Sequence, residues 1–256
     1  MRLGQLTWNG HTTAAIFNHA AARPIPDYTL FDLICRAEKE GAPLTELADR
    51  LAITRAIPAE PMIPLKPREV WACGAAEDSS SGRPVVFLKG TARVCVGPGQ
   101  PIGIRADSKL TVPEPELAVV LGGRGCVLGY TLANDVSARD LEQESPWFIS
   151  SYSGSCALGP VMVTTDELTD PNRLMIAWQI TRDNGVLLKG EISTAALDLE
   201  KLVEYMMRSN PVPAGSILLT GTRIHLPENA ALEAGDVVTI SMEEIGELVN
   251  PAMVIA

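Results

Sequence analysis

Two glutamates separated by one residue, Glu114 and Glu116, are the first positions whose types and spacing could do chemistry. Side chains two residues apart on a strand point to the same face, so both carboxylates would lie together. Like charges repel unless a cation lies between them, and paired oxygens suit a hard divalent ion. Pro115 has no N–H to give to a ladder, which predicts a strand edge or a bulge. The alternative is that both glutamates face solvent, as isolated acidic pairs commonly do.

A third carboxylate follows at the end of an apolar run. The run 127–134 ends in Asp135, and a carboxylate where a buried strand ends is costly unless it is paired or coordinated. Glu114, Glu116 and Asp135 could therefore supply three oxygen ligands, leaving the remaining positions of an octahedral ion for water and substrate. Asp140, next to Arg139, predicts an ion pair that holds the following loop.

A glycine between two hydroxyls, Thr220-Gly221-Thr222, follows the apolar run 217–219. Glycine at a strand end allows a ligand to approach the backbone closely. An ordinary turn explains the same three residues equally well. The residues alone leave both interpretations open.

The composition limits the classes of partner. The chain has 256 residues and a net charge of −10, with no basic run, so we expect neither nucleic acid nor a membrane as a partner. An acidic substrate would need positive charge inside the site. Five cysteines without a CxxC pair predict neither a disulfide framework nor a zinc site. Together with a start that does not resemble a signal peptide, they predict a reduced, cytoplasmic protein.

The first part of the chain predicts a small N-terminal α/β domain over residues 1–62. Strand-like runs at 3–8 and 13–17 flank Asn9-Gly10, a strong hairpin signal. Helical spacing follows at 30–40, with Asp27 as its expected cap, and at 44–52. Four prolines within ten residues then favour an extended linker, which places the domain boundary there.

Residues 67–256 predict a second, β-rich domain. One helix is expected at 197–207, and short strand-like runs are separated by Gly and Pro turns: 70–73, 85–88, 93–96, 117–121, 127–132, 216–219 and 236–242. Strands with few helices favour a β-roll over a doubly wound sheet, so the fold class expected for the whole chain is α+β and β-rich.

Several segments in this domain resemble the fumarylacetoacetate hydrolase superfamily. They are PEPELAVVL (113–121), GYTLANDVSARD (129–140), GSCALGPVMV (154–163), ILLTGT (217–222) and LEAGDVVTISMEEIGELVNP (232–251). The resemblance implies a mixed β-roll catalytic domain and a homodimer or higher homo-oligomer. It also implies that Glu114, Glu116 and Asp135 bind Mg²⁺, or the related ions Mn²⁺ or Ca²⁺.

The resemblance is closer to one branch, the 2-keto-3-deoxy-pentonate (arabinonate) dehydratases. It rests on RPVVFLKGT (83–91), VGPGQPIGIRADS (96–108) and RSNPVPAGSILLTGT (208–222). It implies a hydro-lyase that removes water from a small 2-oxo acid through a metal-stabilised enolate, giving 2-oxoglutarate semialdehyde from a pentonate.

The same resemblance assigns roles to further side chains. Lys89 is expected to pair with a carboxylate, although a surface lysine at a strand end is an equal alternative. Arg139 and the segment 220–222, which comprises Thr220, Gly221 and Thr222, are expected to contact the substrate.

Two departures from the family pattern bear on catalysis. Ser150 stands where the family usually has a lysine, and a hydroxyl cannot replace an ammonium as a charge partner or proton carrier. The lid segment 74–82 is short and has no histidine, which argues against hydrolysis by a His/Glu pair. Glu144 is a candidate for the missing acid or base. Two alternatives remain: a C–C hydrolase, decarboxylase or isomerase on the same fold, or an altered paralogue that keeps only metal or ligand binding.

Overall fold

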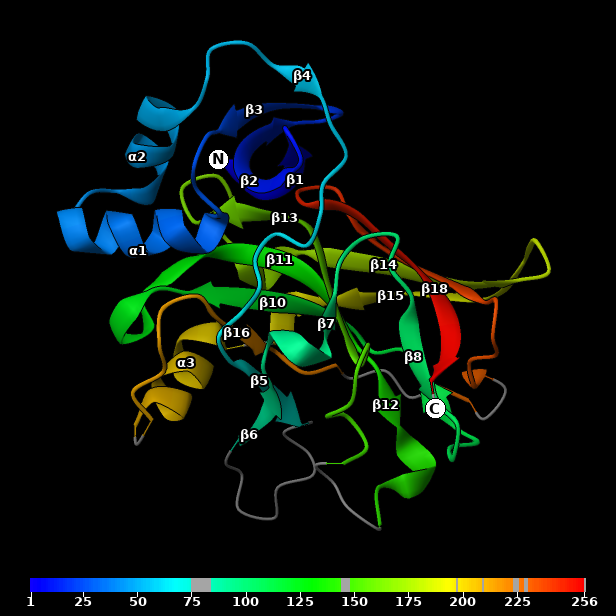
Figure 1. Cartoon of the computed structure of the whole chain (residues 1–256). Coiled ribbons are helices and arrows are strands. Elements are labelled where there is room, and N and C mark those ends of the chain that lie inside the picture. Colours follow the sequence, from blue (N-terminus) through cyan, green and yellow to red (C-terminus); the bar gives the residue numbers. More distant parts are fainter. Residues whose placement is uncertain are drawn as a thin grey trace.

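The computed structural model describes residues 1–74, 84–143, 148–196, 198–208, 210–222, 226–227 and 230–255 (Figure 1). The N-terminal part holds four strands and two helices: β1 (Arg2–Trp8), β2 (His11–Asn18), β3 (Ala21–Ile25), α1 (Leu30–Glu40), α2 (Leu44–Leu51) and β4 (Ile57–Pro58).

The hairpin predicted at the N-terminus is confirmed, and the cap of the first helix is corrected. Strands β1 and β2 pair antiparallel around Asn9 and Gly10, which both have positive φ. Helix α1 is capped by Thr29 and not by Asp27. The Thr29 hydroxyl accepts from the Asp32 N–H, and the Asp32 carboxylate accepts from the Thr29 N–H. This reciprocal capping box satisfies two otherwise unpaired donors.

The rest of the chain is dominated by strands. They are β5 (Val70–Gly74), β6 (Val85–Gly90), β7 (Cys95–Val96), β8 (Ile102–Arg105), β9 (Thr111–Val112), β10 (Pro115–Leu121), β11 (Val127–Asp135), β12 (Ser137–Ala138), β13 (Cys156–Thr164), β14 (Met175–Arg182), β15 (Gly185–Ser193), β16 (Ser216–Leu219), β17 (Val237–Met242) and β18 (Gly246–Ile255). The predicted helix is α3 (Leu199–Met207), capped by the Asp198 side chain. None of the described helices has the length and apolar character needed to cross a membrane.

Over the described residues, the strands form two main sheets. The larger has the order β4-β3-β2-β1-β13-β11-β10-β16-β5-β6, with β7 paired to β13. The smaller has the order β15-β14-β17-β18-β8, and β12 pairs with β9. Most neighbours are antiparallel, whereas β16–β5, β13–β7 and β18–β8 are parallel. The predicted β-rich α+β fold with mixed strand pairing is confirmed.

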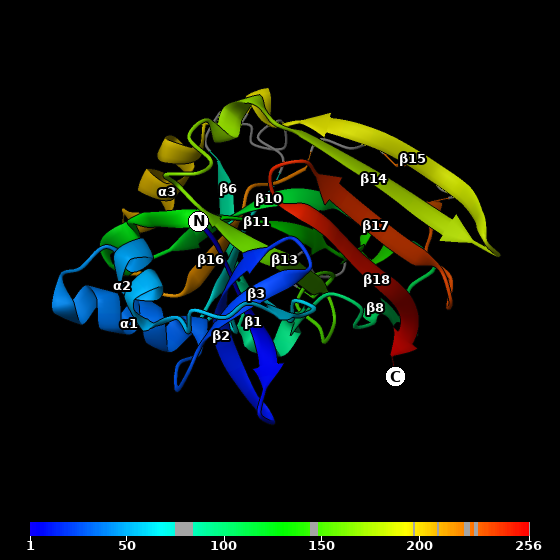
Figure 2. The same ribbon diagram turned by 90° about the horizontal axis from the view of Figure 1, so that it is seen from above.

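The sheets and helices stack in layers. Figure 2 shows α1 and α2 on one side of β13, β11 and β10, and the smaller sheet on the other. Alternate residues of β10 enter the two cores, because side chains of a strand alternate between faces. Leu117 and Val119 pack with Trp178 and other residues of the smaller sheet, whereas Ala118 belongs to the cluster that contains Leu33 of α1.

Two details differ from or extend the sequence expectations. Pro115 begins β10 and pairs with Asn134 of β11. Pairing with β16 starts only at Ala118, so Pro115 has no strand neighbour on that side, as the missing N–H predicted, and no bulge is found there. Strand β1 pairs with β13, so the larger sheet continues from the N-terminal part into the rest of the chain. The division into residues 1–62 and 67–256 stays a prediction.

Candidate metal centre and active site

The three predicted carboxylates come together where β10 begins and β11 ends. Glu114 directly precedes β10, Glu116 is its second residue, and Asp135 is the last residue of β11. The Asp135 N–H donates to the Glu114 carbonyl at 2.8 Å, which fixes the register at this end. One carboxylate oxygen of each residue lies within 4.8 Å of the other two. The sequence spacing therefore places three oxygen ligands around one point.

Burial excludes the alternative in which these glutamates face solvent. Glu116 is 2% exposed and Asp135 is 5% exposed, while the Glu114 side chain is 14% exposed. Charged groups out of water need compensation by paired charges or by coordination.

Lys89 supplies part of that compensation. It lies on β6 and is 1% exposed, so the surface-lysine alternative is wrong. Its Nζ donates to Asp135 Oδ1 and to the backbone carbonyl of Ser150. The charge partner of this lysine in the structure is thus a carboxylate of the triad itself.

Arg139 pairs with Glu114, which corrects the predicted ion pair with Asp140. The Arg139 Nε donates to Glu114 Oε1 at 2.9 Å, and its Nη2 lies 2.7 Å from the same oxygen. Asp140 instead accepts from the Ser108 hydroxyl at 2.6 Å and from the Lys109 N–H at 2.8 Å. Asp140 therefore holds its loop through hydrogen bonds, whereas Arg139 points towards the triad.

The pKa values of the glutamates reflect this crowding. Burial, with the nearby Asp135 charge, raises the pKa of Glu114 to about 7, although Arg139 acts in the opposite direction. Burial and the charges of Asp135 and Glu114 raise the pKa of Glu116 well above its usual range, although the Gly221 N–H favours its ionised form. In both groups burial disfavours the ionised form most, and the neighbouring carboxylates add to this effect.

The donor set fits a divalent cation. In the described part of the chain, Lys89 and Arg139 bring two positive charges to three clustered carboxylates. Three carboxylate oxygens are the ligands that Mg²⁺, Mn²⁺ and Ca²⁺ prefer, and open positions would remain for water or substrate. A bound cation would favour the ionised form of both glutamates, against the burial and the neighbouring charges that raise their pKa values.

The segment 220–222 contacts the triad through its backbone. The Gly221 N–H donates to Glu116 Oε2 at 2.9 Å, and Gly221 has a φ of 83°. A Cβ at this position would lie 2.8 Å from the Cys73 carbonyl oxygen. The Thr220 hydroxyl donates to the Leu117 carbonyl at 2.8 Å. Glycine is required here because the turn is left-handed and tightly packed, whereas substrate contact by Thr220, Gly221 and Thr222 stays a prediction.

Ser150 lies beside the ammonium of Lys89. It is 2% exposed, and its carbonyl accepts from Lys89 Nζ and from the Ser155 hydroxyl. Among the residues that the structure describes, its own Oγ has no hydrogen-bond partner. A buried hydroxyl without a partner is costly, so a ligand or water is its natural acceptor. Lys89 therefore provides a cation next to the residue that occupies the family lysine position.

Some predicted residues cannot be placed. Glu144, the candidate acid or base, lies outside the described residues, and so does most of the short lid segment.

Asn134 was not predicted as a site residue, although it precedes Asp135 in the same buried strand. It is fully buried, and its Oδ1 accepts from the Glu114 N–H at 3.0 Å. Its Nδ2 has no hydrogen-bond partner over the described ranges. The signal was an amide at the end of an apolar run, next to a suspected ligand. Asn134 therefore holds the backbone of the first triad residue.

Comparison with known proteins assigns the class of this fold and site. The model of the fumarylacetoacetate (FAA) hydrolase C-terminal family matches residues 67–253, and the chain belongs to this family.

Among its relatives is the 2-dehydro-3-deoxy-D-arabinonate dehydratase of Saccharolobus solfataricus, which is 45% identical over 66% of this chain and 58% of that protein. A Haloferax volcanii protein named "Probable 2-keto-3-deoxyxylonate dehydratase" is 36% identical over 83% of this chain and 81% of its own length. Among solved structures, 2-keto-3-deoxy-D-arabinonate dehydratase complexed with magnesium and 2,5-dioxopentanoate has a TM-score of 0.83 and 33% identity, covering 100% of this chain and 99% of that one.

Proposed function

We propose that this chain is a Mg²⁺-dependent hydro-lyase that removes one water from a 2-keto-3-deoxy sugar acid, with a pentonate as the first candidate substrate. The observation that carries the proposal is the buried cluster of Glu114, Glu116 and Asp135. The likeness to dehydratases, one of them complexed with magnesium and 2,5-dioxopentanoate, supports the same conclusion. Loss of water from a 2-keto-3-deoxy-pentonate gives 2,5-dioxopentanoate with the carbon skeleton intact.

The three carboxylates would hold the ion. When bound, Mg²⁺ acts as a Lewis acid that polarises the 2-keto group and makes the neighbouring C3 proton easier to remove. The Gly221 N–H orients the Glu116 carboxylate, and Asn134 holds the backbone of Glu114. Arg139 donates to the Glu114 carboxylate itself. Contacts to a carboxylate oxygen orient it as a ligand.

The cations of the site would attract and orient the acidic substrate. Lys89 is buried beside Asp135, and Arg139 is partly exposed beside Glu114. Arginine can hold a carboxylate through two parallel N–H donors, so we assign the outer end of the substrate to Arg139. These charges meet the need of an acidic chain for positive charge inside its site.

Three side chains are assigned to proton transfer and to its support. Removal of the C3 proton needs a base, and departure of the C4 hydroxyl needs an acid. We propose Glu144 as one of these groups. Ser150 would donate its unpaired hydroxyl to the substrate, and Lys89 would keep the charge balance while the proton moves.

The setting of the enzyme is part of the proposal. All five cysteines are free thiols, which supports a reducing cytoplasm. We propose a homodimer or higher homo-oligomer, with a small domain at residues 1–62 and a catalytic domain at 67–256. The family match that begins at residue 67 supports that boundary. Light scattering should give two or more times the single-chain mass of 27.4 kDa. A mass equal to that of one chain would contradict the oligomer.

The test of the reaction is product mass. Purified protein is incubated with 2-keto-3-deoxy-D- and L-arabinonate, with Mg²⁺ or with EDTA, and Glu116→Gln is the matched variant. We expect a product lighter by one water with one enantiomer, formed only with Mg²⁺ and lost in the variant.

Other products would contradict the proposal in distinct ways. Two smaller fragments would indicate a C–C hydrolase, loss of carbon dioxide a decarboxylase, and a product of unchanged mass an isomerase. No turnover of any 2-oxo acid, with Mg²⁺ binding retained, would indicate an altered paralogue.

A further inference from the structure

Two cysteines outside the triad lie side by side on neighbouring strands. Strand β7 pairs parallel with β13, and Cys95 is the register partner of Cys156. Adjacent strands lie about 4.8 Å apart, and register partners point to the same face. That spacing falls within the Cα separation of about 4.4–6.8 Å that a disulfide spans. Cys95 also packs against the apolar cluster that contains Cys156.

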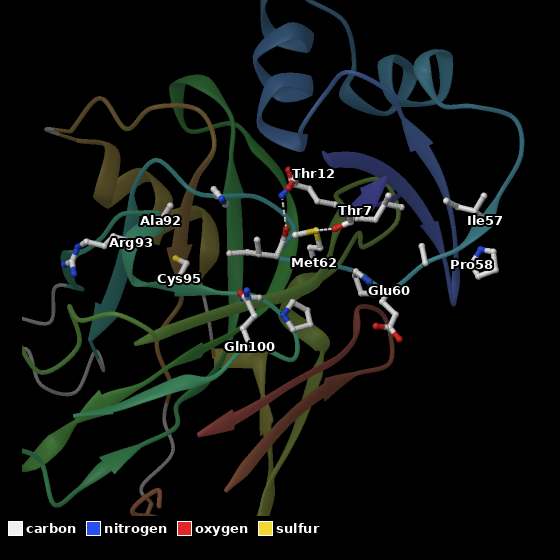
Figure 3. Close-up of a pocket in the computed structure, with 18 residues that line it drawn as sticks. Thr7, Thr12, Ile57, Pro58, Glu60, Met62, Ala92, Arg93, Cys95 and Gln100 are labelled. Atoms are coloured by element: carbon white, nitrogen blue, oxygen red, sulfur yellow. Dashed lines mark hydrogen bonds between the residues drawn. The ribbon is translucent and has the colours of Figure 1, made fainter. Parts of the chain in front are cut away.

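The two thiols differ in access. Cys156 is fully buried, whereas Cys95 is half-buried. Cys95 lines a cavity of about 960 Å³, and Figure 3 shows it with Arg93 and Gln100 on one part of the wall and Thr7 and Thr12 on another. A small solute in this cavity reaches Cys95 first.

This difference in access sets the order of reaction. Cys156 is shielded from solvent, whereas Cys95 lines the cavity, so reaction with a small electrophile begins at Cys95. Cys156, beside it on the neighbouring strand, is the thiol that can resolve the product.

The pair is connected to the metal centre through one strand. Cys156 is the register partner of Asp135 in the pairing of β11 with β13. Any change in the backbone of β13 at Cys156 therefore acts on the strand that ends in a metal ligand.

We propose that Cys95 and Cys156 form an oxidisable thiol pair that hydrogen peroxide converts to an intrachain disulfide, and that this disulfide weakens metal binding at Asp135. The Cys95 thiolate attacks one peroxide oxygen, the O–O bond breaks, and the released hydroxide takes a proton to become water. The sulfur of Cys156 then displaces hydroxide from the Cys95 sulfenic acid, which forms the S–S bond and a second water. Two thiols lose two electrons, which reduce one peroxide.

The test follows peptide masses after mild peroxide treatment of the full chain. We expect one linked peptide pair containing Cys95 and Cys156, lighter by two hydrogens than the two thiol peptides and released by dithiothreitol. Cys95→Ser removes it. Cys126→Ser, at an exposed cysteine, is the matched control and keeps it. Over-oxidation of Cys95 with Cys156 still a free thiol would overturn the proposal.

The coupling has its own readout and rests on the proposed metal centre. Calorimetric titration with Mg²⁺ should give an affinity about tenfold weaker in the oxidised protein, the size typical of disturbed support around a metal ligand, with recovery after reduction. Unchanged affinity would overturn the coupling. A reduced protein without Mg²⁺ affinity would overturn the metal centre and the coupling together, while the peptide masses would still decide the disulfide.

Discussion

Lys89 shows how one buried charge organises the site. Its ammonium is almost fully shielded from solvent and contacts both a carboxylate of the triad and the carbonyl of Ser150. Breaking a buried ion pair by removing one partner leaves the other charge uncompensated, which is more costly than never burying the pair.

Lys89→Met is therefore expected to destabilise the protein. The substitution keeps most of the side-chain volume and leaves Asp135 without its cation, at a cost of about 3 kcal/mol in the free energy of unfolding. Urea unfolding of the EDTA-treated protein measures this. The matched control is Lys66→Met at an exposed lysine, for which we expect a change within about 0.5 kcal/mol. Equal effects of both substitutions would contradict the role of Lys89.

Ser150→Ala separates a ligand contact from a structural one. The Ser150 hydroxyl has no hydrogen-bond partner within the described part of the chain, so its removal should leave the free energy of unfolding unchanged or slightly raised. If the Ser150 hydroxyl donates to the substrate, KM of the variant should be about tenfold higher, which corresponds to the free energy of one hydrogen bond. Steady-state kinetics and urea unfolding give the two numbers. A destabilised variant with normal KM would show that the hydroxyl serves the fold.

The residue types of the triad were predictable, whereas their partners were not. The metal site was predicted from two features of the sequence: the i, i+2 spacing of Glu114 and Glu116, and the position of Asp135 at the end of a strand. No pattern in one sequence shows that Arg139 turns to Glu114 instead of its neighbour Asp140, because that choice depends on how distant segments pack.

Strand pairing is the device that holds these residues in place. The antiparallel register of β10 and β11 places Glu114 beside Asp135, and β16 brings the turn at Gly221 to Glu116. Both arrangements join residues that are far apart in sequence.

Gly221→Ala should disturb this turn and the metal site together. The added Cβ would lie 2.8 Å from the Cys73 carbonyl oxygen, in a left-handed conformation that disfavours other residues. Gly10→Ala is the matched control, with φ of 81° and nothing within 4 Å of the added Cβ. We expect about 1 kcal/mol of destabilisation for Gly10→Ala, a larger loss for Gly221→Ala, and weaker Mg²⁺ affinity only in the latter. Equal Mg²⁺ affinities would remove Gly221 from the metal site.

The elements were predicted where local signals are strong. Asn9-Gly10 fixed the first hairpin, and the spacing of apolar residues gave α1, α2 and α3. The hairpin of β14 and β15 was not identified, although its turn residues Asp183 and Asn184 have the positive φ typical of such turns. The family resemblance predicted a mixed β-roll, whereas the order of strands in the sheets depends on long-range pairing that no local pattern shows.

For the molecule as a whole, the ionised triad lowers the stability of the metal-free protein, and a bound cation would restore it. The pKa of Glu114 is raised from 4.5 to about 7, so the folded state binds this proton more tightly than the unfolded chain. Stability of the metal-free protein therefore falls as pH rises through this window. Mg²⁺ binds the ionised carboxylates and acts in the opposite direction.

Thermal unfolding between about pH 5 and about pH 8 tests this linkage. In EDTA, Tm should fall as pH rises, and the increase in Tm produced by Mg²⁺ should grow over the same interval. Glu114→Gln should flatten both trends, which separates the triad from other titrating groups. A Mg²⁺ effect that shrinks with rising pH would contradict the assignment.

The most direct measurement is calorimetric titration of the reduced protein with Mg²⁺, beside Glu116→Gln. We expect one ion per chain in the wild type and loss of binding in the variant, because Glu116 is the most deeply buried of the three carboxylates. Absence of binding in a folded wild type, or equal affinity in both proteins, would contradict the metal centre on which the proposed reaction depends.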